Sequence, residues 1–140
     1  MDLGLKDRVA IVTGSARGIG AETARMLAQE GMAVVITDLD LDAARETACG
    51  IEREGGRAIA VQCDVRQEDQ VRGMVAAGKD AFGSLDVLVN NAGLVKDRTI
   101  LKMEESDWDL VLDVTLKGAF HTTRAALPFM HEKGWGRIIN

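Results

Sequence analysis

Residues 9–20, with the sequence VAIVTGSARGIG, constrain the fold of this chain more than any other stretch. Residues 9–13 are mostly β-branched or apolar, which is typical of a strand buried on both faces. Glycines follow at positions 14, 18 and 20, and residues 21–30 have the composition of a helix. A strand that leads through a glycine-rich turn into a helix forms an anion site, because the helix directs free N–H groups at a bound phosphate. A tightly packed turn that binds nothing is the alternative reading of the glycines alone.

The alternation of apolar runs and helical stretches continues to the end of the chain. Strands are expected at residues 9–13, 32–37, 58–63, 85–89 and from 137 onward, and helices at 21–30, 41–54, 67–82 and 107–132. Five strands that alternate with four helices predict an α/β fold with a parallel sheet between two helical layers. No repeat or linker interrupts the pattern, so we expect one domain over residues 1–140.

The last predicted helix, over residues 107–132, carries the clearest amphipathic pattern. Ser106 to Asp109 resemble a capping box at its start. One face would carry mostly apolar side chains directed at the sheet: Trp108, Val111, Leu112, Thr115, Ala119, Phe120, Thr123, Ala126 and Leu127. Pro128 removes one backbone hydrogen bond near the end of this helix.

Composition excludes several classes of function. The net charge of −5 and the lack of a basic cluster argue against a nucleic-acid partner. The apolar runs have strand length, which is too short for a membrane span, and the first residues lack the apolar core of a signal peptide. Cys49 and Cys63 lie far apart, which is typical of reduced thiols in a cytoplasmic protein. His121 and His131 lie near no acidic pair, so no metal site is expected.

Polar residues or glycines follow four of the predicted strands directly. They are Gly14 after the first, Asp38 after the second, Asp64 after the third and residues 90–93 (NNAG) after the fourth. Ligands of parallel α/β sheets bind at the carboxyl ends of the strands, near the point where the strand order reverses. The pattern therefore predicts a nucleotide site at this edge of the sheet.

These motifs together resemble the classical short-chain dehydrogenases/reductases. Residues 13–20 (TGSARGIG) match the family's Thr-Gly-x-x-x-Gly-x-Gly signature, and Asp64-Val65 and residues 90–93 match its next two motifs in the right order. Residues 96–108 and 134–140 are closest to 3-oxoacyl-thioester reductases and 3-hydroxyacyl dehydrogenases. The resemblance implies a Rossmann-type doubly wound sheet in a three-layer αβα arrangement, of which the first five strands are present.

The resemblance also assigns residues to a bound dinucleotide. Gly14, Gly18 and Gly20, with Ser15 and Ile19 between them, would form the pyrophosphate turn. Arg17 would lie near the adenosine ribose, or it is a solvated turn residue. These assignments make the glycine-rich turn the centre of the expected site.

The remaining cofactor residues follow the other strands. Asp38 would accept hydrogen bonds from both ribose hydroxyls and repel a 2′-phosphate, which predicts NAD rather than NADP. Its alternative role is to cap the next helix. Asp64 and Val65 would flank the adenine, or Asp64 would only cap a turn.

The resemblance places the segment after the fourth strand beside the ribose and nicotinamide. Ala92 and Gly93 belong to this segment, and Gly93 would admit a close approach of the cofactor. Asn91 is expected mainly to brace the sheet rather than to contact the cofactor.

The chain departs from the family pattern in its catalytic residues. Family members transfer a hydride between nicotinamide and a secondary alcohol or ketone, with help from a serine and a Tyr-x-x-x-Lys segment. This chain contains no tyrosine, and the resemblance places the serine and that segment beyond Asn140. We therefore expect a cofactor-binding part of a longer oxidoreductase, inactive by itself. A truncated or regulatory nucleotide-binding protein is the alternative, and a flavodoxin-like module is a more distant one.

A second departure concerns the long helix, where Thr115 replaces an asparagine that many family members place in a catalytic tetrad. Thr115 would either organise a water chain in the active site or donate its hydroxyl hydrogen to the Val111 carbonyl. The resemblance further implies a homodimer or homotetramer that assembles through residues 107–132.

Overall fold

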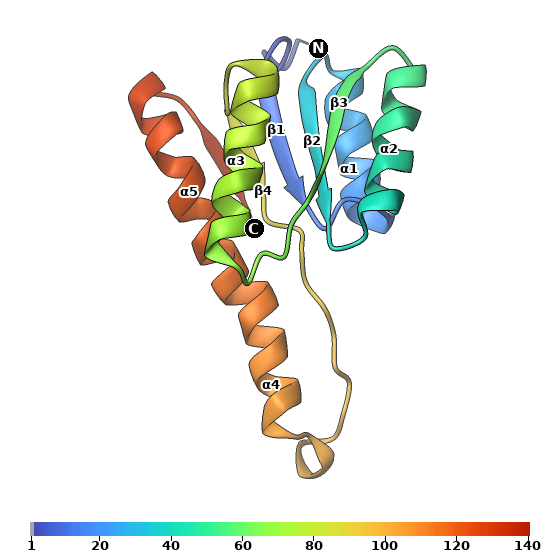
Figure 1. The fold of residues 1–140 in the computed structure, drawn as a ribbon, viewed down its shortest axis with the longest axis vertical. Coiled ribbons are helices and arrows are strands. Elements are labelled where there is room, and N and C mark those ends of the chain that lie inside the picture. The colour runs from blue at the N-terminus through green and yellow to red at the C-terminus, as the bar shows by residue number, and fades with distance from the viewer. Residues whose placement is uncertain (1) are drawn as a thin grey trace.

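The computed structural model describes residues 2–140 and contains a five-stranded, entirely parallel sheet (Figure 1). Its strands lie in the order β3-β2-β1-β4-β5. The strands are β1 (Val9–Thr13), β2 (Ala33–Asp38), β3 (Arg57–Gln62), β4 (Val87–Val89) and β5 (Arg137–Ile139). The helices are α1 (Gly18–Gln29), α2 (Leu41–Arg53), α3 (Glu68–Phe82), α4 (Glu105–Leu112) and α5 (Gly118–Lys133), with a short 3-10 turn η1 (Ile100–Lys102) and a π-helical turn η2 (Asp113–Lys117).

The parallel sheet predicted from the alternating pattern of the sequence is confirmed, and the structure adds the strand order. The chain adds β2 and β3 on one side of β1 and then returns to place β4 on the other side. The order therefore reverses between β1 and β4, which is the point where open α/β sheets bind their ligands.

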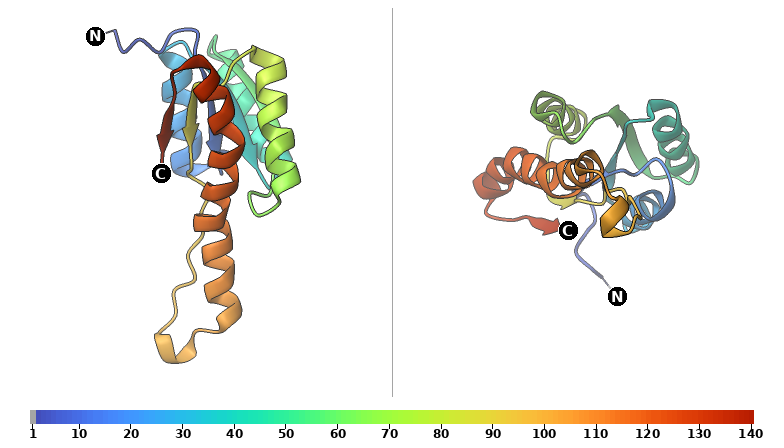
Figure 2. Two further views of the ribbon diagram at one scale, coloured as in Figure 1. Left: turned by 90° about the vertical axis from the view of Figure 1, so that its left-hand side faces the viewer. Right: turned by 90° about the horizontal axis from the view of Figure 1, so that it is seen from below.

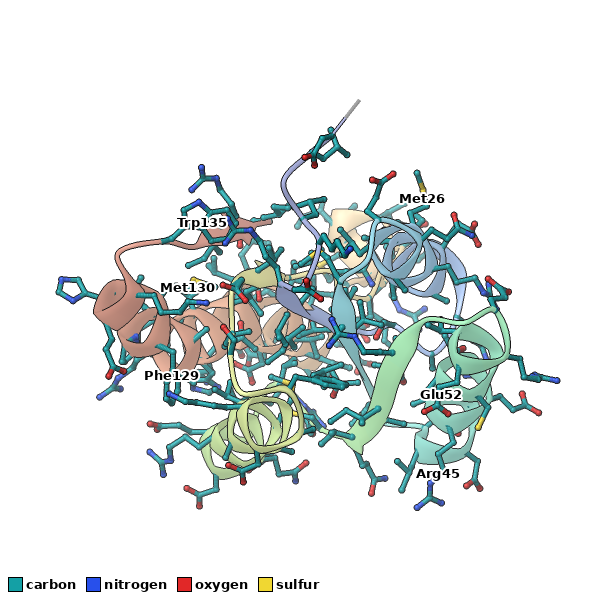
Figure 3. The ribbon with its side chains drawn as sticks, turned by 90° about the horizontal axis from the view of Figure 1, so that it is seen from above. Met26, Arg45, Glu52, Phe129, Met130 and Trp135 are labelled. Carbon is teal, nitrogen blue, oxygen red and sulfur yellow. The ribbon has the colours of Figure 1, made fainter. Side chains whose placement is uncertain are left out.

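Helices cover both faces of the sheet, as Figures 1 and 2 show. Along β1, Ala10 and Val12 pack in the cluster beneath α1 and α2, whereas Ile11 packs in the cluster beneath α3 and α5. Because successive side chains of a strand point to opposite faces, a strand covered on both sides is apolar throughout. Figure 3 shows side chains filling the space between the helices and the strands, with Met130 on the sheet side of α5.

The helix ends follow the glycines of the sequence. Gly31 adopts φ 87° directly after the last turn of α1, and Gly83 adopts φ 77° at the end of α3. This left-handed conformation is accessible to glycine without steric cost, and it closes a helix. Both predicted helix ends are thus confirmed.

The long helix predicted for residues 107–132 differs from its expected form. The path is continuous, but it begins at Glu105 and contains the π-helical turn η2 between α4 and α5. The predicted capping box is wrong, because Glu104 occupies the N-cap position and no side chain caps the helix.

The prediction of which face of this helix is buried is also wrong over most of its length. Trp108, Leu112, Phe120 and Leu127 are 39–56% exposed, and Thr115 is exposed as well. The buried positions of α5 are Gly118, Thr122, Ala126 and Met130. Figure 2 shows the reason for α4: this helix and the preceding loop extend well beyond the end of the sheet, so its apolar face meets no strand. In α5 the buried positions form a different face from the predicted one, which leaves Phe120 and Leu127 exposed.

Candidate cofactor site

The turn after β1 approaches the segment after β4 so closely that two glycines are sterically required. A Cβ atom on Gly14 would lie 2.9 Å from the Cα atom of Ala92. A Cβ atom on Gly20 would lie 2.5 Å from the Gly14 carbonyl oxygen and 2.5 Å from the Asn91 amide nitrogen. The contacts with Ala92 and Gly14 involve backbone atoms and the contact with Asn91 its side-chain amide, so the absence of a Cβ atom at both glycines lets the turn lie against the segment after β4.

Gly18 has a different role in the same turn. It adopts φ 59°, and no heavy atom lies within 4 Å of the position that a Cβ atom would occupy. Gly18 is also the first residue of α1, whose N-cap residue Arg17 forms no side-chain capping hydrogen bond. The first N–H groups of a helix have no acceptor within the helix. The start of α1 is therefore uncapped by any side chain and fits an anionic group such as a diphosphate.

Asn91 braces this arrangement, as the sequence predicted. Its amide donates hydrogen bonds to the carbonyl oxygens of Thr13 (3.0 Å) and Gly14 (2.9 Å). The Thr13 hydroxyl accepts a hydrogen bond from the Ala92 N–H group at 2.9 Å. These three bonds join the carboxyl ends of β1 and β4 and fix the geometry of the turn between them.

A cavity of about 290 Å³ lies at the carboxyl ends of β1, β2, β3 and β4. Seven of the predicted cofactor residues line it: Gly14, Asp38, Asp64, Val65, Asn91, Ala92 and Gly93. Arg17, Gly18, Ile19 and Gly20 lie in the turn outside this lining, and the Ile19 side chain is 81% exposed. The structure thus brings together the ends of four strands, while the first turn of α1 lies next to them.

Ser15 is held entirely by the sheet. Its hydroxyl donates to the Val12 carbonyl at 2.6 Å and accepts from the Thr37 N–H group at 3.0 Å. Its own N–H group donates to the Thr37 carbonyl at 2.9 Å. These bonds join β1 to β2 and occupy the hydroxyl and the N–H group of Ser15.

Asp38 lies at the end of β2, facing the glycine-rich turn. Its carboxylate accepts hydrogen bonds from the N–H groups of Ala16 (3.2 Å) and Asp40 (3.3 Å). Asp40 rather than Asp38 caps α2, because its carboxylate accepts from the Ala43 N–H group. The capping role considered for Asp38 is therefore wrong, and its carboxylate lines the cavity.

Arg17 forms an ion pair with Asp40 across the mouth of the site, with 2.6 Å between the guanidinium and the carboxylate. The N–H group of Ala43 and the guanidinium of Arg17 together lower the pKa of Asp40. Two aspartates therefore stand beside the position where the adenosine ribose is expected, and the nearby arginine is already paired.

Asp64 forms a bidentate ion pair with Arg66, whose Nη2 atom lies 2.6 Å from Oδ2. The hydrogen bonds from the Arg66 side chain hold the pKa of Asp64 below its ordinary value. The carboxylate also accepts from the Arg66 N–H group at 3.0 Å, which is the turn-capping role considered as its alternative. Asp64 thus stays ionised at the edge of the cavity.

Five lining residues were missed by the sequence-based reasoning: Thr37, Leu39, Cys63, Leu94 and Val114. Thr37 and Cys63 stand one position before predicted site residues, so their place at the strand ends could have revealed them. Val114 lies in η2, which the sequence did not predict. Burial, followed by the charge of Asp64, raises the pKa of Cys63 to about 11, so this thiol remains protonated at neutral pH.

Thr115 lies in η2, and π-helical turns within helices are frequent at functional sites. Among residues 2–140 its hydroxyl has no hydrogen-bond partner, so the predicted bond to the Val111 carbonyl is wrong. A Cβ atom on Gly93 would lie 3.5 Å from the Thr115 hydroxyl oxygen. The hydroxyl therefore faces the segment after β4.

Asn140 directly follows β5, and its side chain is joined to the end of β4. Its Oδ1 atom accepts a hydrogen bond from the Asn90 amide at 2.8 Å. Asn140 does not line the cavity at the strand ends, but it shares a second hollow along α5 with Thr115. Asn140 was not among the predicted site residues, so this contact was not expected from the sequence. The catalytic serine, tyrosine and lysine expected beyond Asn140 lie outside the described residues and stay a prediction.

No helix in the described part of the chain combines the length and apolarity needed to cross a membrane. No three His, Cys, Asp or Glu side chains among residues 2–140 converge to form a metal-binding group.

The strand order and the glycine-rich turn define a Rossmann-type α/β protein. The family model for short chain dehydrogenases matches residues 8–140. The chain therefore belongs to the short-chain dehydrogenase family.

Curated relatives match nearly the whole chain. It is 42% identical over 138 residues to the (2S)-[(R)-hydroxy(phenyl)methyl]succinyl-CoA dehydrogenase subunit BbsD of Thauera aromatica, covering 99% of this chain and 56% of that protein. It is 46% identical over 135 residues to the short-chain reductase protein NovJ of Streptomyces niveus (96% and 52%). It is 42% identical over 137 residues to a 3-oxoacyl-[acyl-carrier-protein] reductase of Synechocystis (97% and 56%). The chain spans about half the length of these relatives.

Proposed function

We propose that this chain is the cofactor-binding part of a nicotinamide-dinucleotide-dependent oxidoreductase. The protein would transfer a hydride between the nicotinamide and a secondary alcohol or ketone. One observation carries the proposal: the uncapped, glycine-rich start of α1 opens beside the cavity where the strand order reverses.

The residues present fit a dinucleotide. The open space at Gly18 and the free N–H groups of the first turn of α1 suit the two phosphates. Asp38, Asp64 and the segment after β4 line a continuous cavity that would receive the adenosine and the nicotinamide riboside. The bound nicotinamide would donate or accept the hydride, and the residues of this chain would bind and orient it.

We further propose that NAD is preferred over NADP. The Asp38 carboxylate would face the ribose hydroxyls of the bound cofactor, and Asp40 lies next to it on the same turn. A 2′-phosphate at this position would meet two negative charges, and the cation that could neutralise it, Arg17, is already paired with Asp40.

The substrate class follows from the relatives rather than from this chain. Two of them are named as acting on acyl thioesters, a CoA ester and an acyl-carrier-protein ester, so a 3-oxoacyl or 3-hydroxyacyl thioester is the proposed substrate. A nucleotide-binding protein without catalysis is the second candidate, supported by the lack of tyrosine in these 140 residues.

A homodimer or homotetramer is proposed from the exposed apolar face of the long helix. Trp108, Leu112, Leu116 and Phe120 recur every four residues and are 39–67% exposed. Burial of such a face against a second copy would remove it from water. The free thiols of Cys49 and Cys63 suit a reducing compartment such as the cytoplasm.

Binding of the reduced cofactors to the full-length protein tests the proposal directly. Titration followed by nicotinamide fluorescence should give a smaller Kd for NADH than for NADPH. Oxidation of a panel of secondary alcohols and 3-hydroxyacyl thioesters with NAD then separates the enzyme from the non-catalytic candidate. A protein that binds neither dinucleotide contradicts the proposed function.

A further inference from the structure

The turn after β3 rests against α5, although the two segments are 56 residues apart along the chain. The imidazole Nδ1 atom of His121 lies 2.9 Å from the Val65 carbonyl oxygen. Because a carbonyl oxygen only accepts hydrogen bonds, Nδ1 carries the hydrogen and donates it. A side chain of α5 therefore holds the backbone of the segment that lines the cavity.

A second contact holds the same turn at its side chain. Val65 is 7% exposed and packs into a notch that Gly118 leaves at the start of α5. A Cβ atom on Gly118 would lie 2.6 Å from the Val65 Cγ2 atom. The hydrogen bond and the notch together fix the position of Val65.

The neighbouring residue Asp64 is held on two sides: its N–H group donates to the Gln70 side chain on α3 at 2.9 Å, and the adjacent Val65 docks on α5. Its carboxylate lines the cavity, yet its side-chain bonds run to Arg66, which belongs to the same turn. The ion pair between Asp64 and Arg66 therefore orients the carboxylate within the turn but does not anchor the turn to the body of the protein. The contacts of Val65 with α5 supply an anchor.

We propose that His121 is a positioning residue for recognition of the adenine base of the cofactor. It donates a hydrogen bond to the Val65 carbonyl and so holds Asp64 and Val65 where the exocyclic amine of adenine can meet the Asp64 carboxylate. This inference rests on the proposed function, because it assumes that the cavity binds a dinucleotide. It concerns a residue that contacts neither the cofactor nor the reacting atoms.

The test compares NADH with its hypoxanthine analogue, deamino-NADH, in which a carbonyl oxygen replaces the exocyclic amine. In the full-length wild-type protein, NADH should bind more tightly than deamino-NADH. The variant His121→Leu removes the donor, and loss of one hydrogen bond should weaken NADH binding by about three- to tenfold. Deamino-NADH should lose less, so the ratio of the two dissociation constants moves toward one. A general loosening of the fold would weaken both nucleotides equally.

Two further variants separate the hydrogen bond from other effects. His121→Asn keeps an N–H donor at nearly the same distance from the backbone as Nδ1, so it should restore most of the discrimination. His131→Leu makes the same exchange at an exposed position of α5 and should leave both dissociation constants unchanged.

Gly118→Ala provides a test that does not rely on histidine. The new methyl group would displace Val65, while alanine strengthens the helix itself by about 0.5–1 kcal/mol relative to glycine. Reduced discrimination in a protein with an undiminished melting temperature would support the proposal.

The outcomes distinguish this inference from the proposed function. Failure of the wild-type protein to bind either NADH or NADPH overturns both. NADH binding with an unchanged NADH to deamino-NADH ratio in His121→Leu overturns only the role of His121. Equal loss of discrimination in His121→Leu and His121→Asn also overturns it, because the donor would then be irrelevant.

Discussion

Asp38 is the residue on which the proposed preference for NAD over NADP rests. Its carboxylate lies at the end of a buried strand and is held by two N–H groups, those of Ala16 and Asp40. These bonds keep the negative charge at one place in the cavity. A charge that is held fixed discriminates more sharply between a hydroxyl and a phosphate than a mobile one does.

The variant Asp38→Asn should shift the preference toward NADPH. Asparagine keeps the shape of the side chain but removes the negative charge that, in the proposed complex, would bond the ribose hydroxyls and repel a 2′-phosphate. A hydrogen bond to a charged group contributes about 1.5–3 kcal/mol, so the ratio of the Kd values for NADPH and NADH should fall at least tenfold. Asp42→Asn, an exposed exchange on α2, is the matched control. An unchanged ratio in Asp38→Asn would contradict the role of this residue.

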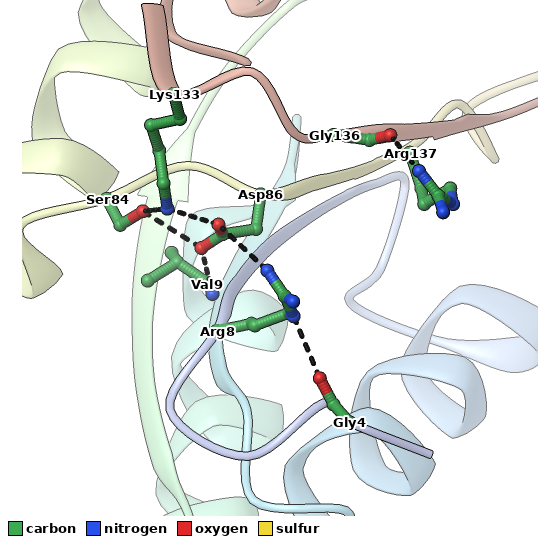
Figure 4. A network of polar contacts seen from close by, with 8 residues as sticks. All are labelled: Gly4, Arg8, Val9, Ser84, Asp86, Lys133, Gly136 and Arg137. Carbon is green, nitrogen blue, oxygen red and sulfur yellow. Dashed lines mark hydrogen bonds and ion pairs between the residues drawn. The ribbon is translucent and has the colours of Figure 1, made fainter.

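Asp86, at the opposite end of the sheet, is a second aspartate whose carboxylate is held in place by hydrogen bonds. It is 1% exposed and accepts hydrogen bonds from the Val9 N–H group (2.9 Å), the Ser84 hydroxyl (2.9 Å) and the Lys133 ammonium group, with Arg8 3.7 Å away (Figure 4). Burial alone would raise the pKa of Asp86, but the hydrogen bonds from Lys133, Val9 and Ser84 outweigh it and lower the pKa. The carboxylate therefore connects β1, β4 and α5.

The variant Asp86→Asn should destabilise the protein by about 2 kcal/mol, because it removes the charge that these donors share. Since the folded pKa lies below the unfolded value of about 4, the stabilisation is complete above that pH and is lost as the pH falls toward the folded pKa. The difference between wild type and variant in thermal unfolding should thus be largest near neutral pH and shrink below about pH 4. Asp80→Asn, an exposed exchange on α3, should show no such difference. A difference that stays constant down to pH 3 would contradict the assignment.

At the scale of elements, the strands and the first three helices could be predicted because their signals are local. A buried strand such as β1 is a short apolar run, and glycines such as Gly31 and Gly83 end helices through their own conformation. The cluster of Asp38, Asp64 and Asn91 followed from the rule that parallel strands present their carboxyl ends together. These inferences do not depend on which elements pack against one another in the folded protein.

The long helix could not be predicted in the same way, because its burial depends on where it runs. Its apolar spacing was read as a face directed at the sheet, yet α4 leaves the sheet and Trp108 remains 55% exposed. Nothing in the spacing distinguishes a face that meets the sheet from one that does not. The turn η2 was missed for a related reason, since one extra residue in a helical turn leaves no compositional signal.

A further prediction concerns the role of Thr115, which lies in the turn η2. Its hydroxyl faces Gly93 and has no hydrogen-bond partner among the described residues. In the full-length enzyme, Thr115→Val should therefore lower kcat by roughly three- to tenfold, the effect of one neutral hydrogen bond, with little change in the KM for NAD. Thr115→Asn should keep or raise kcat, while Thr99→Val, outside the cavity lining, should match wild type. Equal kcat values in all three variants would reject a role of Thr115 in turnover.

At the scale of the whole molecule, the exposed face of the long helix predicts assembly. Introducing a charge at its centre, as in Leu116→Glu or Phe120→Glu, should lower the molecular mass measured by light scattering to that of a smaller species. Met26→Glu adds the same charge to an exposed apolar position on the outer side of α1 (Figure 3) and should not change the mass. An unchanged mass in both helix variants would contradict assembly through this face.

The parallel sheet separates two kinds of residue along its strands. The Asp86 cluster joins elements at the amino ends of β1 and β4, whereas the cavity lies at their carboxyl ends. Residues around the cavity can therefore diversify by mutation while the cluster preserves the scaffold. A library randomised at lining positions that do not brace the sheet, such as Leu39, Asp64 and Leu94, should yield many folded proteins with altered ligand preference, whereas one randomised around Asp86 should yield mainly unfolded chains.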